Sequence, residues 1–227
     1  MPFYFYYDLP YILLVVVSLA LGGLTQGYIN KTYRKWSKVT GSIGMTGAQV
    51  ARRMLDDGGA RDVGITRVSG HLTDYYDPRD NRLHLSDENF EGASVASVAV
   101  ACHEAGHAVQ TAKGYVPGRV RTALVPVVNF SQQAWAVVFL VGVFLGLTGF
   151  VYLAIALFAF SVVFQLVTLP VEIDASRRAV AYLSQAGLAI DERGARQVLT
   201  AAALTYVAAA LISVLQLLYL VGRTDRD

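Results

Sequence analysis

The sequence predicts a mainly α-helical membrane protein with about four transmembrane helices and a small cytoplasmic α/β unit. Hydrophobic residues make up 54% of the 227 residues and charged residues only 16%, whereas a typical soluble domain has about 25% charged residues. Long stretches of the chain lack charges, and the basic residues gather between them. The formal net charge of +2 argues against nucleic acid as a partner, and the single cysteine, Cys102, excludes an internal disulfide.

The N-terminal segment, residues 1–30, is predicted to be a transmembrane helix. Residues 9–29 contain no Asp, Glu, Lys, Arg or His, and about 20 apolar residues in a helix span a hydrocarbon core of about 30 Å. A cleaved signal peptide is the alternative. No basic residue precedes the stretch, however, and no small-residue cleavage site follows it, so we expect the helix to be retained.

The next segment, residues 31–122, is polar and predicts a small α/β unit. Residues 46–58 begin with the N-cap residue Thr46, have helical periodicity and end at a glycine, which indicates a helix. Residues 61–70 and 81–86 are typical of short strands, and the second alternates Leu83 and Leu85 with polar residues. Residues 77–81, Asp-Pro-Arg-Asp-Asn, predict a turn between them.

Residues 123–170 predict a transmembrane hairpin. Fifty consecutive residues, 122–171, contain no Asp, Glu, Lys, Arg or His. A single helix of that length would be about 75 Å long, so the run must fold back. Gly146-Leu-Thr-Gly149 is the expected turn, which gives spans at residues 124–145 and 150–169. A fourth apolar run, residues 198–221, predicts a last span within the C-terminal segment 198–227.

The basic residues predict the orientation in the membrane. Residues 30–122 hold 13 of the 19 Lys and Arg, and residues 171–198 hold 4 more. Positively charged loops stay on the cytoplasmic side. Four spans with both chain ends outside therefore place both polar segments in the cytoplasm.

One motif carries the chemistry: residues 103–107 are His-Glu-Ala-Gly-His. Histidines at positions i and i+4 lie on one face of a helix, so both imidazoles can bind one zinc ion. Glu104 lies about 100° around the helix from His103, from where it can reach a water at the metal and act as a general base. The surrounding stretch, residues 93–113, is rich in small residues compatible with a helix, and it ends before Gly114.

A catalytic zinc also needs a third protein ligand, and we expect Glu172 in that role. It begins a predicted cytoplasmic helix in the segment 171–197, directly after the third span. Asp174 points about 200° away from Glu172 on a helix, so only one of the two can face the metal. The alternative is that Glu172 pairs with Arg177 or Arg178 at the membrane interface.

The sequence resembles the bacterial membrane-embedded neutral zinc metallopeptidases of the YugP-like group. The resemblance lies in the His-Glu-Ala-Gly-His core and in four further stretches: residues 46–52, 76–79, 85–86 and 170–179. It implies a zincin-like fold and a zinc-dependent endopeptidase of the bacterial inner membrane, with His103, His107 and Glu172 as zinc ligands and Glu104 as the base. The chain is more distantly similar to the heat-shock membrane peptidases, in which an aspartate follows the third ligand by four residues. Ser176 stands there in this chain, so support from a carboxylate is absent.

The expected function is hydrolysis of peptide bonds in membrane or misfolded proteins at the cytoplasmic face. A zincin binds its substrate in extended form along an edge strand, and residues 81–86 are the candidate here, although an internal strand has the same pattern. Two alternatives are an intramembrane site-2-type protease, with the motif helix in the bilayer, and a non-catalytic zinc-binding scaffold. The length of residues 92–112 permits the first, but their Ala- and Ser-rich composition favours a buried core helix.

Overall fold

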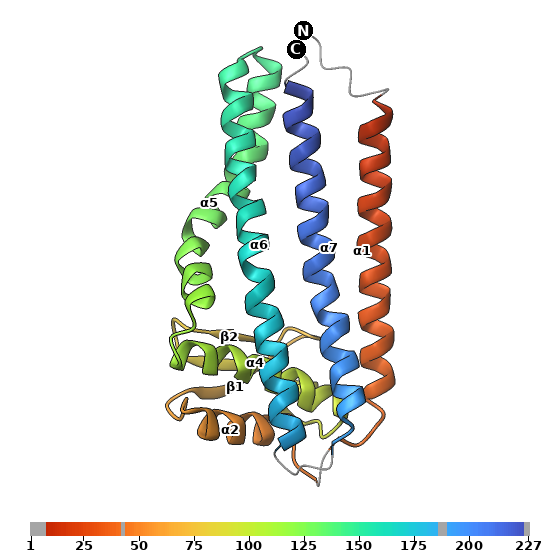
Figure 1. Cartoon of the computed structure of the whole chain (residues 1–227), viewed down its shortest axis with the longest axis vertical. Helices are drawn as coiled ribbons and strands as arrows, with labels where there is room; N and C mark the ends of the chain where they lie inside the picture. The colour runs from red at the N-terminus through yellow and green to blue at the C-terminus, as the bar shows by residue number, and fades with distance from the viewer. Residues whose placement is uncertain (1–7, 42–43, 186–189, 225–227) are drawn as a thin grey trace. The chain divides into compact units, whose positions relative to one another are not determined.

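The computed structural model describes residues 8–41, 44–185 and 190–224. These residues form two compact units. Of the described residues, unit 1 comprises 8–25, 120–169 and 205–224, and unit 2 comprises 26–41, 44–119, 170–185 and 190–204. Each unit is therefore assembled from segments that are distant in the sequence, and Figure 1 labels the helices and strands that these segments form.

Four described helices are long and apolar enough to cross a membrane, as the sequence predicts. They are α1 (Leu9–Trp36), α5 (Val116–Phe144), α6 (Thr148–Gln185) and α7 (Glu192–Thr224). Each extends beyond the apolar run that predicted it. The predicted hairpin turn is confirmed, because α5 ends at Phe144, α6 begins at Thr148, and Gly146 between them has a positive φ of 66°.

Helix α6 does not end where its apolar run ends. It continues through Pro170 to Gln185, so Glu172 lies in the same helix as the third span and does not begin a new one. Proline lacks the backbone N–H that an inner helical position normally donates. The helix nevertheless continues, and its last turns pack within unit 2, where Ala179 and Leu183 join the hydrophobic core.

Unit 2 contains a small sheet and the helices packed against it. Helix α2 (Gly47–Gly58) begins with a capping box between Thr46 and Gln49 and ends at Gly59 in the left-handed conformation. Strands β1 (Gly64–Val68), β2 (Tyr75–Asp77) and β3 (Arg82–Ser86) follow, then the short helix α3 (Asp87–Glu91). The predicted helix, the two predicted strands and the turn are thus present, with shorter strands and one additional strand, β2.

The order of the strands is β1-β3-β2, with β1 parallel to β3 and β2 antiparallel to it. The expectation that residues 81–86 form an edge strand is therefore wrong, because β3 has a neighbour on both sides. Its alternation was interpreted correctly, since Leu83 and Leu85 are fully buried. Alternation reports which face of a strand meets the core, and it carries no information on how many strands pair beside it.

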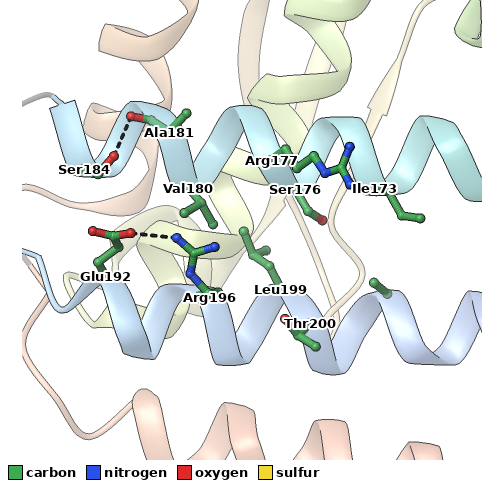
Figure 2. Close-up of a pocket in the computed structure, with 11 residues that line it drawn as sticks. Ile173, Ser176, Arg177, Val180, Ala181, Ser184, Glu192, Arg196, Leu199 and Thr200 are labelled. Atoms are coloured by element: carbon green, nitrogen blue, oxygen red, sulfur yellow. Dashed lines mark hydrogen bonds and ion pairs between the residues drawn. The ribbon is translucent and has the colours of Figure 1, made fainter.

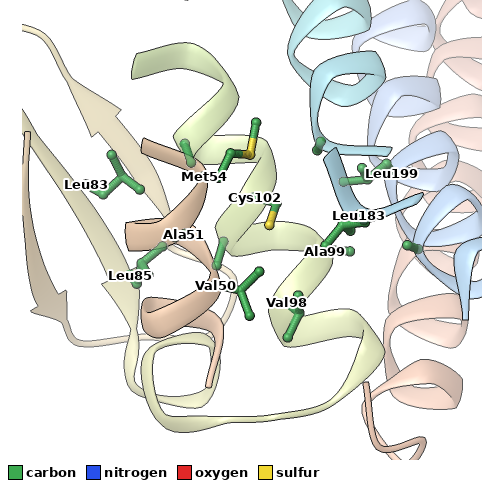
Figure 3. Close-up of a cluster of buried hydrophobic side chains, with 14 of the residues drawn as sticks. Val50, Ala51, Met54, Leu83, Leu85, Val98, Ala99, Cys102, Leu183 and Leu199 are labelled. Carbon is green, nitrogen blue, oxygen red and sulfur yellow. The ribbon is translucent and has the colours of Figure 1, made fainter. Parts of the chain in front are cut away.

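Helix α4 (Val95–Ala112) carries the His-Glu-Ala-Gly-His motif through the centre of unit 2. Ser94 caps its N-terminus by accepting a hydrogen bond from the backbone N–H of Ser97, and 15 of its 18 residues are buried. Apolar side chains of α2, β3, α6 and α7 pack around it (Figure 3). Cys102 lies in this cluster, fully buried, and burial raises the pKa of its thiol.

Gly106 allows α4 and α6 to approach closely. A Cβ atom at this position would lie 2.8 Å from the backbone oxygen of Ala175 and 3.2 Å from its Cα. Ala175 is itself fully buried. A glycine within the motif and an alanine on the partner helix therefore bring the two backbones together one turn away from Glu172.

We predict that Gly106→Ala destabilises the protein. Alanine favours a helix by about 1 kcal/mol over glycine, but forcing a methyl group against a backbone oxygen typically costs about 1–3 kcal/mol. Thermal unfolding in detergent should show a lower midpoint. Gly149→Ala is the matched control, since a Cβ there meets nothing within 4 Å. A Gly106→Ala protein at least as stable as wild type would contradict the tight packing.

Candidate metal centre

Helix α4 presents two imidazoles on one face. The ring centroids of His103 and His107 lie 4.8 Å apart, with the ring planes at 82°. The two residues are only 8% and 9% exposed. This is the arrangement that the i, i+4 spacing predicts.

Glu172 completes the group from α6. Its Oε2 atom lies 3.2 Å from Nε2 of His103 and 3.4 Å from Nε2 of His107. The residue is 2% exposed, which makes it one of the largest fully buried side chains. The possible ligand atoms of His103, His107 and Glu172 all lie within 4.8 Å of one another. Among the described residues this is the one group of three or more His, Cys, Asp or Glu side chains close enough to hold a metal ion.

The donor set fits zinc. Zinc binds imidazole nitrogen and carboxylate oxygen at about 2.0–2.2 Å, which in a tetrahedral site separates the donor atoms by roughly 3.3 Å. The two distances from the Glu172 oxygen to the imidazole nitrogens match this separation. Two histidines and one glutamate are also a ligand set found in catalytic zinc sites, where one further coordination position stays open.

Both imidazoles are held at their other ring nitrogen. Nδ1 of His103 lies 3.1 Å from the hydroxyl oxygen of Ser176, and Nδ1 of His107 lies 3.1 Å from Oε1 of Gln110. Ser176 provides no carboxylate, as expected from the sequence, but its hydroxyl does contact the histidine. Such contacts orient a metal-binding ring and fix which nitrogen faces the metal.

Asp174 has a different position from Glu172, as the helical rotation predicts. It accepts a hydrogen bond from Nε of Arg178 at 2.6 Å and another from Nε2 of Gln110 at 2.8 Å. The alternative was a pairing of Glu172 with Arg177 or Arg178. In the structure Arg178 pairs with Asp174, Arg177 lies along a cavity between α6 and α7, and Glu172 contacts the two histidines.

Glu104 is buried beside the group, 8% exposed. Burial raises the pKa of its carboxyl to about 7, with smaller increases from the negative charges of Glu172 and Asp74. The nearby His103 and a hydrogen bond from the backbone N–H of Tyr76 lower the pKa in the opposite direction. A carboxyl group whose pKa lies near neutrality suits both accepting and returning a proton.

The remaining histidines lie outside this group. His84 stacks on Tyr75 with ring centroids 4.4 Å apart and contacts Asp80, and His71 contacts Glu88. The hydroxyl of Tyr76 donates to Asn81. Their side chains therefore have partners on the surface of the α/β unit.

Two residues at the centre were not predicted from the sequence, Gly106 and Gln110. Gln110 is 2% exposed and follows His107 by three residues, so it shares the histidine face of α4. A glutamine on that face of a helix made mostly of Ala and Val was the available signal. Gly106 had no such signal, because the close contact of its backbone with Ala175 exists only in the folded chain.

A cavity of about 370 Å³ lies between the last turns of α6 and the first turns of α7 (Figure 2). Ser176 is one of its lining residues, and Arg177 and Arg196 lie along it. Since Ser176 contacts Nδ1 of His103, the cavity approaches the imidazole from the side opposite Glu172. It is therefore not where a peptide bond would meet the metal ligands.

Comparison with known proteins identifies the family. The family model described as "putative neutral zinc metallopeptidase" matches residues 11–224. A curated relative from Bacillus subtilis (strain 168), named "Putative membrane protease YugP", is 43% identical over 210 residues, which cover 92% of this chain and 93% of the relative. The comparison with solved structures gave no match. Because the family model matches nearly the whole chain, this protein belongs to the neutral zinc metallopeptidase family.

Proposed function

We propose that this chain is a zinc-dependent endopeptidase of the bacterial inner membrane that cleaves membrane or misfolded proteins. His103, His107 and Glu172 hold the zinc ion, and Glu104 is the general base. The observation that carries the proposal is the approach of one buried carboxylate oxygen of α6 to both imidazoles of α4, beside a buried glutamate whose pKa is raised to about 7.

The proposed reaction divides the work between the metal and Glu104. A zinc ion in such a site acts as a Lewis acid that acidifies water and polarises the scissile carbonyl. The Glu104 carboxylate takes a proton from the attacking water and delivers it to the nitrogen of the leaving amine. Burial of Glu104 among protein groups keeps bulk water away from this proton transfer.

The substrate strand is reassigned from β3 to β2. Among the described strands β2 pairs with β3 alone, and the backbone of Tyr76 in β2 is close enough to the Glu104 carboxylate to lower its pKa slightly. An extended peptide that pairs with the free edge of β2 would bring its backbone next to the base, by the β-augmentation used in many peptide-binding sites. The stacked pair Tyr75 and His84 lies at this end of the sheet.

The metal centre is proposed to face the cytoplasm. The positive charges of residues 30–122 and 171–198 favour that side. Helix α4 is not among the four candidate spans, and its burial by other protein segments favours a centre within the polar unit over a lipid-exposed one. The burial of α4 by protein also disfavours the intramembrane alternative.

We predict that Glu104→Gln keeps stoichiometric zinc, because residue 104 is not a proposed ligand. The variant should lose proteolysis, because the amide cannot accept the proton from water. His107→Ala should lose the metal as well as the activity. Elemental analysis of purified protein and cleavage of an unfolded protein substrate in detergent measure the two properties. Cleavage by Glu104→Gln at the wild-type rate would exclude Glu104 as the base.

The third ligand is tested separately. Glu172→Ala should lose tight zinc binding, since only the two imidazoles would remain as ligands. Asp174→Asn, two residues away, should retain it. Dialysis against a weak chelator followed by metal analysis distinguishes the two variants. Tight zinc binding by Glu172→Ala would mean that another residue is the third ligand.

The orientation is tested by cysteine labelling in a Cys102→Ser background. A membrane-impermeant maleimide added to intact cells should label Leu147→Cys, in the turn between α5 and α6. Arg61→Cys, an exposed position in the polar unit, should be labelled only after the cells are permeabilised. The opposite pattern would place the metal centre outside the cytoplasm.

A further inference from the structure

Gln110 contacts a proposed ligand but is not one itself. It lies on α4 three residues after His107 and is almost completely buried, and its Oε1 atom is 3.1 Å from Nδ1 of His107. A buried glutamine is costly unless its amide is hydrogen-bonded. Its other contacts therefore determine what it does to the histidine.

The orientation of the Gln110 amide is fixed by two acceptors. Its Nε2 atom lies 2.9 Å from the backbone oxygen of Val171 and 2.8 Å from Oδ2 of Asp174. A backbone carbonyl and a carboxylate can only accept hydrogen bonds. With the amide reversed, its oxygen would face both acceptors without a proton between them. The nitrogen must therefore point to α6 and the oxygen to His107.

The fixed amide determines the tautomer of His107. Since Oε1 of Gln110 can only accept, Nδ1 of His107 must be the protonated nitrogen. The lone pair of the neutral ring is then on Nε2, the atom that lies 3.4 Å from Glu172. Ser176 cannot select the tautomer of His103 in this way, because a hydroxyl both donates and accepts.

Arg178 supports the far end of this chain of contacts. Its Nε donates to the same Asp174 oxygen that accepts from Gln110, at 2.6 Å. Asp174 and Arg178 are both partly exposed. The contacts thus run from a partly exposed ion pair on α6, through the buried amide, to the imidazole on α4.

We propose that Gln110 is a positioning residue that holds His107 as its Nδ1–H tautomer and thereby sets the affinity of the centre for zinc. Asp174 acts through Gln110 by fixing its amide. This inference rests on the proposed function, because it takes His107 as a zinc ligand. It adds a determinant of metal affinity that lies outside the His-Glu-Ala-Gly-His motif.

The first test compares the zinc affinity of Gln110→Leu with that of wild type. Leucine preserves most of the side-chain volume and removes the acceptor. Loss of such an outer contact typically weakens metal binding by about 10- to 100-fold, measured as Kd by competition with a chromogenic chelator in detergent. Gln185→Leu, on the exposed last residue of α6, is the matched control and should bind zinc as wild type does.

The second test uses rescue by a conservative variant. Asp174→Ala removes the acceptor that fixes the amide and should weaken zinc binding by about tenfold, at the lower end of the range, because Val171 still holds Gln110. Asp174→Asn can still accept from Gln110 and should stay close to wild type. The visible spectrum of the Co²⁺-loaded protein should change in Gln110→Leu and Asp174→Ala but not in Asp174→Asn. A general loss of stability would not produce this pattern of spectra.

The outcomes separate this inference from the proposed function. Wild-type zinc affinity in a folded Gln110→Leu protein overturns the inference and leaves the function intact. If Gln110→Leu does not fold, equal affinities of Asp174→Ala and wild type overturn it instead. A wild-type protein that binds no zinc overturns both.

Discussion

The structure depends on a buried carboxylate that two helices bring to a pair of imidazoles. Glu172 is 2% exposed, and an ionised carboxylate at that depth is strongly unfavourable unless opposite charges or hydrogen-bond donors compensate it. The two Nε2 atoms of α4 lie next to its Oε2 atom, and a divalent cation bound between the three groups would supply the opposite charge. The close approach at Gly106 and Ala175 is what makes the contact possible.

The contacts around the imidazoles divide into two kinds. At Nε2 both rings face the same carboxylate oxygen, whereas at Nδ1 each ring has its own partner, Ser176 or Gln110. Metal-binding histidines commonly have such a partner, because it fixes the ring and its tautomer. Helix α6 provides Glu172, Ser176 and the acceptors of Gln110, so a single helix provides the proposed third ligand and the groups that orient the two imidazoles.

The continuity of α6 has a physical consequence. The helix is a candidate span over its apolar part and carries Glu172, the proposed third metal ligand, beyond Pro170 without interruption. A carboxylate on a rigid helix is held more precisely than one on a loop, which suits a centre that must leave one coordination position open. The same last turns of α6 contribute Ala179 and Leu183 to the hydrophobic core of unit 2, so hydrophobic packing stabilises the segment that carries Glu172.

The sequence by itself determined the four apolar helices, the hairpin turn, the capped helix α2 and the pairing of His103 with His107, because each depends on local periodicity or on residues within one helical turn. It also singled out Glu172, by its position directly after the third span. Only the tertiary structure decided that β3 is internal, that Gly106 meets Ala175, and that Gln110 connects His107 to Asp174. These are contacts between elements separated by many residues, and local periodicity carries no information about which elements meet.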